Sequence, residues 1–242
     1  YLDHVRIGYI PSGSSNDLAR DMEMSAKSTV LMEKILKNEQ GYLMDVGNLQ
    51  FASVSEEHSC LYNQERFSGV KRFNVSCGIG FDAAVCEEAL HSKMKEVLNR
   101  FKMGKLVYLC IALKQLIKAK RVSCDLYLDG KEPIHLKRLL FVSCMNHKYE
   151  GGGFMFGPDA DYQDGMLDLC VVGNIPKPLI LVALPTAMKG KHFVFPCIEK
   201  YRAREIHIKT SEPLWVHTDG EVYVKSDDIY IKNEPTKMRM IV

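Results

Sequence analysis

The chain reads, from residue 150 to residue 168, Glu150-Gly151-Gly152-Gly153-Phe154-Met155-Phe156-Gly157-Pro158-Asp159-Ala160-Asp161-Tyr162-Gln163-Asp164-Gly165-Met166-Leu167-Asp168. Three consecutive glycines permit backbone conformations that are closed to other residues. Four carboxylates then follow within ten positions, and such a group can supply oxygen ligands for Mg²⁺ or Ca²⁺, although the spacing is not that of an EF-hand. The alternative is an acidic surface turn that leads into a strand over Met166–Val172. The local sequence leaves both interpretations open.

The composition of the whole chain is that of an ordinary folded protein. Of its 242 residues, 46% are hydrophobic and 26% are charged, which excludes a disordered or collagen-like chain. Lys and Arg number 32 against 30 Asp and Glu, so bulk charge gives no indication of nucleic-acid binding. No apolar run reaches the roughly 20 residues that cross a bilayer. The eight cysteines form no close pair, which favours reduced thiols and a cytoplasmic location over disulfides.

The periodicity divides the chain into two parts. A strand over Val5–Ile10, a loop of small residues, a helix over Ala26–Lys37 and a strand over Tyr42–Val46 predict an α/β beginning. The remainder is rich in strands but contains two clear helices. The first is predicted over Gly104–Lys120, with an apolar side that includes Ile117. The second is predicted over Pro178–Met188, with Pro near its start and Gly190 at its end. The later strands are expected at Val122–Leu128, Leu140–Cys144, Glu205–Lys209, Leu214–His217 and Ile229–Lys232.

Two further segments carry polar groups in patterns that suit chemistry. In the loop Gly13–Asp17, glycine lets backbone approach a ligand, and the following helix start presents unpaired N–H groups to phosphate. A plain Ser/Asn/Asp helix cap is the alternative there. In His217-Thr218-Asp219-Gly220-Glu221, two carboxylates on a tight turn can hold a metal or act as a base toward a hydroxyl. The alternative is a hairpin turn built on Asp-Gly.

Taken together and in order, these motifs resemble those of the diacylglycerol kinase catalytic-domain family, which includes bacterial diacylglycerol kinases and sphingosine kinases. Ile10–Arg20 resembles its P-x-G-T-x-N-D-F-A segment, and Asn74–Val85 resembles N-x-x-x-x-G-F-D-A-x-V. Gly151–Asp168 is similar to its most specific block, G-G-G-x-x-x-x-P-x-A-x-x-x-D-G-x-L-D. Lys189–His192 resembles its G-x-H element and Asp219–Glu221 its terminal D-G-E. The match spans roughly residues 7–225, and Ser14 stands where the family usually has Thr.

The resemblance implies an α/β nucleotide domain like that of phosphofructokinase and NAD kinase, followed by a β-rich sandwich. Residues 1–47 would be the end of the first domain, and residues 48–242 would be the second. The G-G-D-G-T nucleotide loop of the family is absent, so we expect an N-terminally truncated chain. A catalytically impaired, metal-stabilised binding or regulatory module is therefore one alternative. A kinase for another lipid, such as a sphingoid base, is a second, and a soluble relative of NAD kinase is a third.

By motif position, the resemblance also implies roles for individual residues. The nucleotide phosphates of ATP would face Gly13, Ser14 and Asn16. The catalytic Mg²⁺ network would include Asp17 and Asp45, and the base for the lipid hydroxyl would be Glu221, with Asp219 beside it. A second, structural Mg²⁺ would bind Asp161, Asp164 and the carbonyl of Met166.

The implied substrate is a lipid alcohol at the membrane surface, most simply diacylglycerol, which would be converted to phosphatidic acid. Contact with the membrane would be peripheral, and no nucleic-acid partner is expected. Candidate basic contacts are Lys114, Lys118, Lys120 and Arg121, although a solvated helix face also explains them. The sequence leaves open whether the protein forms a homodimer.

Overall fold

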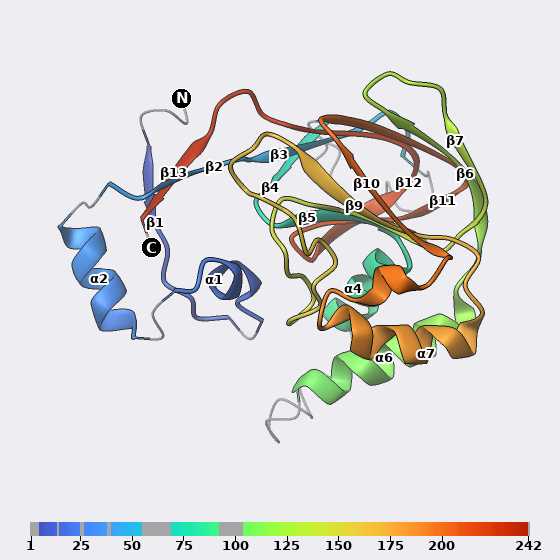
Figure 1. The fold of residues 1–242 in the computed structure, drawn as a ribbon, viewed down its shortest axis with the longest axis horizontal. Helices are drawn as coiled ribbons and strands as arrows, with labels where there is room; N and C mark the ends of the chain where they lie inside the picture. Colours follow the sequence, from blue (N-terminus) through green and yellow to red (C-terminus); the bar gives the residue numbers. More distant parts are fainter. Residues whose placement is uncertain are drawn as a thin grey trace.

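The computed structural model describes residues 5–13, 15–24, 27–37, 40–54, 69–91 and 104–241. These residues form a small α/β part and a larger part built on a ten-stranded sheet (Figure 1). The elements of the small part are β1 (Arg6–Gly8), α1 (Asp17–Asp21), α2 (Ser28–Leu36), β2 (Tyr42–Met44) and β13 (Met238–Ile241). The α/β beginning and the strand-rich remainder that the sequence predicts are confirmed.

The small sheet has the strand order β1-β13-β2, so its middle strand comes from the far end of the described chain. β13 runs parallel to β1, with Met240 opposite Ile7, and antiparallel to β2. Its core consists of the buried side chains of Leu18, Met44, Val46, Met238 and Met240. A strand from the range 48–242 thus belongs to the sheet that residues 1–47 begin. A domain boundary at residue 47 stays a prediction.

The large sheet has the order β10-β9-β8-β5-β11-β12-β3-β4, and the β6–β7 hairpin is attached to β11. Its strands are β3 (Gly47–Phe51), β4 (Val70–Phe73), β5 (Ser76–Gly80), β6 (Val122–Leu128), β7 (Ile134–Leu139), β8 (Phe141–Met145), β9 (Leu167–Val172), β10 (Ile198–Ala203), β11 (Glu205–Thr218) and β12 (Glu221–Asn233). β11 pairs with β6 over its first half and with β5 over its last three residues. The sheet therefore curls, and one of its faces encloses the main hydrophobic core.

β11 is one strand where the sequence predicts two. Pro213 has no N–H to donate to a ladder, and the register of β11 against β12 shifts between Lys209 and Leu214. This irregularity bends the strand without ending it. The main core inside the curl contains Leu49, Ile79, Leu126, Leu169, Ile206 and Ile229.

Three helices belong to the large part: α4 (Phe81–His91), α6 (Gly104–Lys118) and α7 (Lys177–Ala187). A second apolar cluster joins Leu116 of α6 and Ile180 of α7 to Phe141 and Val172 of the sheet. Because both faces of β8 and β9 are covered, every residue of these strands is buried. The sequence places Ile117 on the apolar side of its helix, whereas its side chain is 77% exposed. No described helix is long and apolar enough to span a membrane.

Candidate active site

The beginning of α1 lies against the three-glycine loop of the large part. Oδ2 of Asp17 accepts the backbone N–H of Gly152 at 2.8 Å, and Oδ1 accepts Nη1 of Arg20 at 2.7 Å. Gly152 and Gly153 have φ values of 86° and 120°, and a methyl group on Gly153 would lie 2.7 Å from Nη1 of Arg20. Burial raises the pKa of Asp17, and the N–H of Gly152 partly offsets this rise. Glycine is therefore required where this loop meets α1.

The predicted phosphate loop precedes α1 directly. Asn16 is the N-cap residue of α1 and has a left-handed backbone (φ 50°, ψ 41°), but its side chain makes no capping hydrogen bond. The simple cap that the sequence offers as an alternative is therefore not formed by Asn16. Gly13 comes close to it, since a Cβ there would lie 3.2 Å from Oδ1 of Asn16. Ser14 lies outside the described residues.

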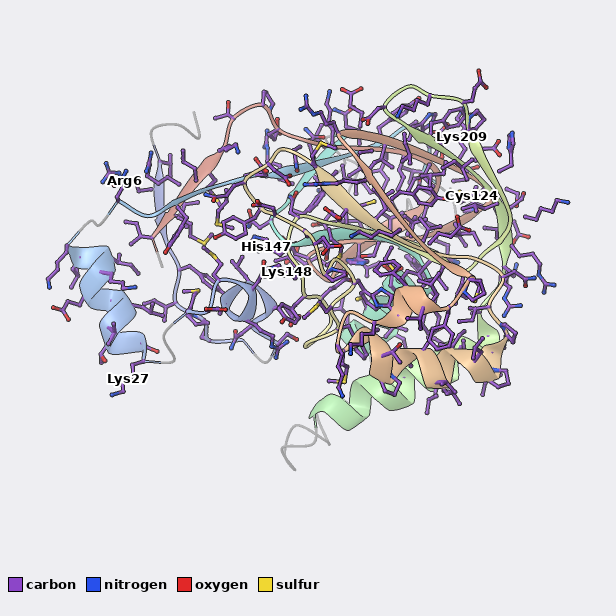
Figure 2. The ribbon with its side chains drawn as sticks, viewed as in Figure 1. Arg6, Lys27, Cys124, His147, Lys148 and Lys209 are labelled. Atoms are coloured by element: carbon purple, nitrogen blue, oxygen red, sulfur yellow. The ribbon has the colours of Figure 1, made fainter. Side chains whose placement is uncertain are left out.

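A second contact joins the end of α1 to the large part. Asp21 is 2% exposed at its side chain, and its Oδ2 lies 2.8 Å from Nδ1 of His147. The ring of His147 stacks on that of Tyr162 at a centroid distance of 4.8 Å. Lys148 approaches the same carboxylate, with 3.7 Å between Nζ and Oδ1. Figure 2 shows His147 and Lys148 where the large part faces α1. The sequence indicated none of these pairings, because isolated His and Asp residues have no characteristic spacing.

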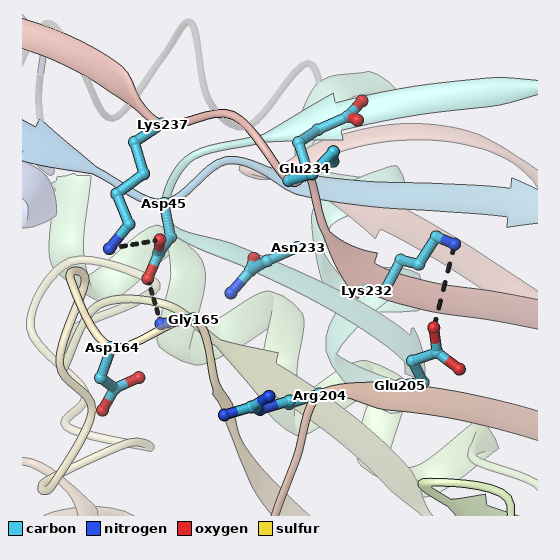
Figure 3. A pocket seen from close by; sticks show the side chains of 10 residues that line it. Asp45, Asp164, Gly165, Arg204, Glu205, Lys232, Asn233, Glu234 and Lys237 are labelled. Carbon is cyan, nitrogen blue, oxygen red and sulfur yellow. Dashed lines mark hydrogen bonds and ion pairs between the residues drawn. The ribbon is translucent and has the colours of Figure 1, made fainter.

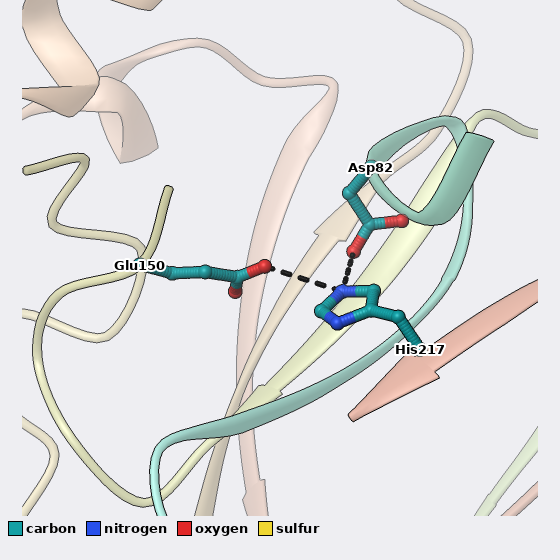
Figure 4. A group of neighbouring side chains, drawn as sticks. All are labelled: Asp82, Glu150 and His217. Atoms are coloured by element: carbon teal, nitrogen blue, oxygen red, sulfur yellow. Dashed lines mark hydrogen bonds and ion pairs between the residues drawn. The ribbon is translucent and has the colours of Figure 1, made fainter. Parts of the chain in front are cut away.

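Next to the glycine loop lies a buried cluster of Asp82, Glu150 and His217 (Figure 4). Nε2 of His217 lies 3.2 Å from Oδ2 of Asp82 and 3.2 Å from Oε1 of Glu150. Glu150 also accepts the hydroxyl of Ser143 at 2.7 Å. Burial alone would lower the pKa of His217, yet Cys86 and the carboxylates of Glu150 and Asp82 hold that pKa well above its ordinary value. Nε2 of His217 therefore faces two carboxylates.

The cluster also reaches the predicted catalytic turn. The backbone nitrogen of Gly220 lies 3.3 Å from Nδ1 of His217. Asp82 stands in the predicted G-F-D-A stretch, Glu150 directly precedes the glycines, and His217 begins the segment that ends at Glu221. Each residue thus belongs to one of the quoted sequence motifs, but the sequence does not predict that the three side chains lie within contact distance of one another.

Asp219 lies on the turn between β11 and β12, and Glu221 is the first residue of β12. The carboxylate of Asp219 accepts three backbone N–H groups, from Asn74 at 2.8 Å, Val75 at 2.8 Å and Ser76 at 3.0 Å. It holds two chain segments together, and burial raises its pKa despite these donors. Glu221 is exposed, and its Oε2 accepts the hydroxyl of Tyr223 at 3.2 Å. Of the two, Glu221 is the carboxylate that is open to a substrate.

Asp45 lies apart from this group, in a cavity of ≈ 360 Å³ that Asp164 and Gly165 also line (Figure 3). Oδ2 of Asp45 accepts the N–H of Gly165 at 2.7 Å, and Oδ1 lies 3.2 Å from Nζ of Lys237. Arg204 and Lys232 line the same cavity. The structure therefore brings Asp45 together with the predicted structural metal loop.

The oxygen atoms of Asp161, Asp164 and Met166 suit Mg²⁺ by chemical type. Asp161 is exposed, and its Oδ1 accepts the N–H of Gln163 at 2.9 Å. Asp164 accepts the N–H of Met166 at 2.9 Å and pairs with Arg202, and the carbonyl of Met166 accepts the Asn233 amide at 3.3 Å. A cation here would have to displace Arg202 from Asp164, so a structural Mg²⁺ at this loop stays a proposal.

Comparison with known proteins places these motifs in a family. Residues 75–242 match the family described as the YegS C-terminal NAD kinase beta sandwich-like domain. A diacylglycerol kinase of Mycobacterium tuberculosis (strain H37Rv) is 26% identical over 217 residues, which is 90% of this chain and 63% of that protein. The YtlR protein of Bacillus subtilis (strain 168), named as a candidate lipid kinase, is 23% identical and covers 99% of this chain and 73% of its own length.

The fold has a counterpart among solved structures. The crystal structure of a candidate diacylglycerol kinase from Bacillus anthracis (strain Sterne) superposes with a TM-score of 0.64 at 22% identity. The superposition covers 96% of this chain and 68% of that one. This similarity supports the arrangement of an α/β part followed by a β-rich part. The chain spans 63% of the length of the mycobacterial relative.

Proposed function

The chain belongs to the diacylglycerol kinase-like family of lipid kinases, and from this we propose that it takes part in transferring the γ-phosphoryl group of ATP to the hydroxyl of a membrane lipid alcohol. Diacylglycerol is the substrate that we expect, because the mycobacterial relative is named a diacylglycerol kinase. The observation that carries the proposal is the contact between Asp17 and Gly152. It joins the predicted phosphate loop to the glycines that begin the most specific family block.

The chain of contacts continues from the glycine loop to the predicted base. Glu150 precedes the loop and pairs with His217, and His217 lies beside the backbone of Gly220. Glu221 directly follows Gly220 at the start of β12, so the predicted phosphate-binding and proton-accepting segments are connected by direct contacts. Phosphoryl transfer depends mainly on such positioning and on neutralisation of charge. This connection supports a common site for the two segments.

We assign roles to the residues on this basis. When bound, ATP with Mg²⁺ supplies the phosphoryl group and neutralises its charge. Gly13, Asn16 and the backbone at the start of α1 would bind the phosphates, and Asp17 would hold the metal. Asp219 fixes the turn through its three N–H contacts, and Glu221 would accept the proton of the lipid hydroxyl. A positioned base of this kind contributes about 10²–10⁴-fold to the rate.

The test is the variant Glu221→Gln in the complete protein that the gene encodes, assayed with ATP and a panel of lipid alcohols in detergent micelles. The change removes the charge and nearly preserves the shape, so turnover should fall by about 10²–10⁴-fold with little change in nucleotide affinity. The matched control is Glu212→Gln, which alters an exposed glutamate of the preceding strand that pairs with Lys120, and its turnover should be unchanged. Near-normal turnover in a well-folded Glu221→Gln protein contradicts the assignment, and Asp219 then becomes the candidate.

A further inference from the structure

α7 has an apolar face on its outside as well as on its inside. Ile180, Ala183 and Ala187 are buried against the sheet. On the opposite side, Leu181 is 47% exposed and Val182 is 59% exposed. Pro178 and Pro185 are also exposed on that side, as the spacing of three and four residues requires. The outer face of a surface helix is ordinarily polar, so this helix lacks the residues that would suit it to water.

The exposed apolar surface continues beyond α7 on both sides. Nζ of Lys177 donates to the carbonyl of Ile117 at 2.6 Å, which holds the start of α7 beside the end of α6. Past the other end of α7, Met188 is 50% exposed and Val194 is 74% exposed. Figure 1 shows α6 and α7 together along one side of the large sheet. We call this surface, made of Ile117, Leu181, Val182, Met188 and Val194, the apolar face.

The segment that carries most of the apolar face has charges of one sign. No Asp or Glu occurs between Asp168 and Glu199, and Lys177, Lys189 and Lys191 lie within that stretch. Lys189 and Lys191 are exposed beside Met188. A second copy of this chain would bring like charges together, so self-association through this face is disfavoured. An apolar surface flanked by lysines is complementary to an anionic lipid surface.

The basic residues that the sequence analysis proposed for membrane contact are mostly engaged elsewhere. Lys114 pairs with Glu88, and Lys120 pairs with Glu212 at 3.0 Å. Arg121 donates to the backbone carbonyl of Ile175. These contacts tie α6 and the following segment to the protein, whereas within the described part of the chain no ion pair joins Lys189 or Lys191 to a carboxylate.

The apolar face is continuous with the candidate active site. The carbonyl of Ala187, at the end of α7, accepts the N–H of Met155 at 2.9 Å. Gly190 packs on the same residue, since a Cβ there would lie 2.8 Å from Sδ of Met155. Met155 is three residues after Gly152, the loop residue that contacts Asp17. A bilayer on the apolar face would therefore lie next to the glycine loop that contacts Asp17.

We infer that the apolar face of α6 and α7, with Lys189 and Lys191 at its edge, docks on the surface of an anionic lipid bilayer. This inference rests on the proposed function, because a lipid kinase must reach a substrate that stays in the membrane. It deepens that function by naming the surface through which the protein approaches the bilayer. Burial of apolar side chains and attraction of the lysines to anionic headgroups both contribute to such binding.

The experiment measures co-sedimentation of this chain with phosphatidylglycerol vesicles and with phosphatidylcholine vesicles, in the absence of ATP. The double variant Leu181→Asp/Val182→Asp places two charges on the face and should reduce binding to phosphatidylglycerol by tenfold or more, roughly. The double variant Lys189→Gln/Lys191→Gln should reduce it by about fivefold per lysine, and only on the anionic vesicles. The control Leu36→Asp changes a side chain on α2 that is 77% exposed, and it should leave binding unchanged.

Equal vesicle binding by wild type and both double variants overturns the inference, as does wild-type chain that does not sediment with phosphatidylglycerol. If Leu181→Asp/Val182→Asp converts a dimer to a monomer without altering vesicle binding, the face joins two copies instead. Unchanged melting temperatures show that the variants fold. Because sedimentation needs no turnover, its failure is separable from failure of the proposed function, which appears as absent phosphorylation of every lipid alcohol in micelles.

Discussion

Protonation of His192 should destabilise the folded protein at mildly acidic pH. This side chain follows α7, is 1% exposed, and lies against the rings of Phe156 and Phe193 at centroid distances of 5.8 Å and 4.0 Å. Its Nε2 lies 3.5 Å from Sγ of Cys170, and its Nδ1 has no hydrogen-bond partner among the described residues. Burial lowers the pKa of His192 to about 4. The imidazole is therefore folded in its neutral form.

The magnitude follows from the two pKa values. An unfolded histidine titrates near pH 6.5, so its stabilising contribution is complete above that pH and is lost as the pH falls toward 4. Between pH 7.5 and pH 5 the loss from this one group is about 2 kcal/mol in the free energy of unfolding. Asp17 and Asp82, whose pKa values burial raises, change stability in the opposite sense as the pH falls.

The assay compares urea unfolding of wild type and His192→Gln at pH 7.5, 6.5, 5.5 and 5.0. The substitution removes the titrating group at similar volume, and the other titrations cancel in the difference between the two proteins. We expect wild type to be the more stable at pH 7.5 and the gap to narrow by about 2 kcal/mol at pH 5. A gap that stays constant over the whole series refutes the reasoning, since it shows that His192 is not forced to stay neutral.

Three other outcomes are expected. Mg²⁺ should raise the melting temperature of wild type but not of Asp164→Ala, because binding to the native state alone stabilises it; an equal shift in both proteins shows that the loop is only a turn. Asp219→Asn should reduce the free energy of unfolding by about 1–3 kcal/mol, since a backbone N–H loses its acceptor, and a wild-type urea midpoint argues against this role. Gly78→Ala should cost about 1–3 kcal/mol because its methyl group would overlap Asp82 and His217, and unchanged stability shows that the buried cluster can move.

Local pattern predicted the elements that depend on neighbours in sequence. The helix over Pro178–Met188 is found as α7, since proline near its start and glycine after its end act locally. The pairing of Asp82 and Glu150 with His217 depends on residues that are far apart in sequence, and nothing local indicates it. Likewise, the sequence predicts two strands on either side of Pro213, where the structure has the single bent strand β11.

In the candidate site, too, some features follow from local sequence and others depend on long-range packing. Motif order predicts roles for Asp17, Asp219 and Glu221, but it does not distinguish an exposed carboxylate from one that accepts three backbone amides. Periodicity placed Ile117 with the apolar residues of its helix without showing whether anything covers it. Covering depends on which elements meet in three dimensions, and that information is carried by long-range packing.

The middle position of β13 in the small sheet sets the order in which the protein can assemble. β1 and β2 leave the ribosome early, yet they have no pairing with each other, and the strand between them is translated more than 200 residues after β1. Contacts of such large sequence separation form late, because the intervening chain must first be ordered. Asp17 is carried by the segment between β1 and β2. The nascent chain should therefore complete its large sheet first, and α1 should settle against the glycine loop only after β13 has been made.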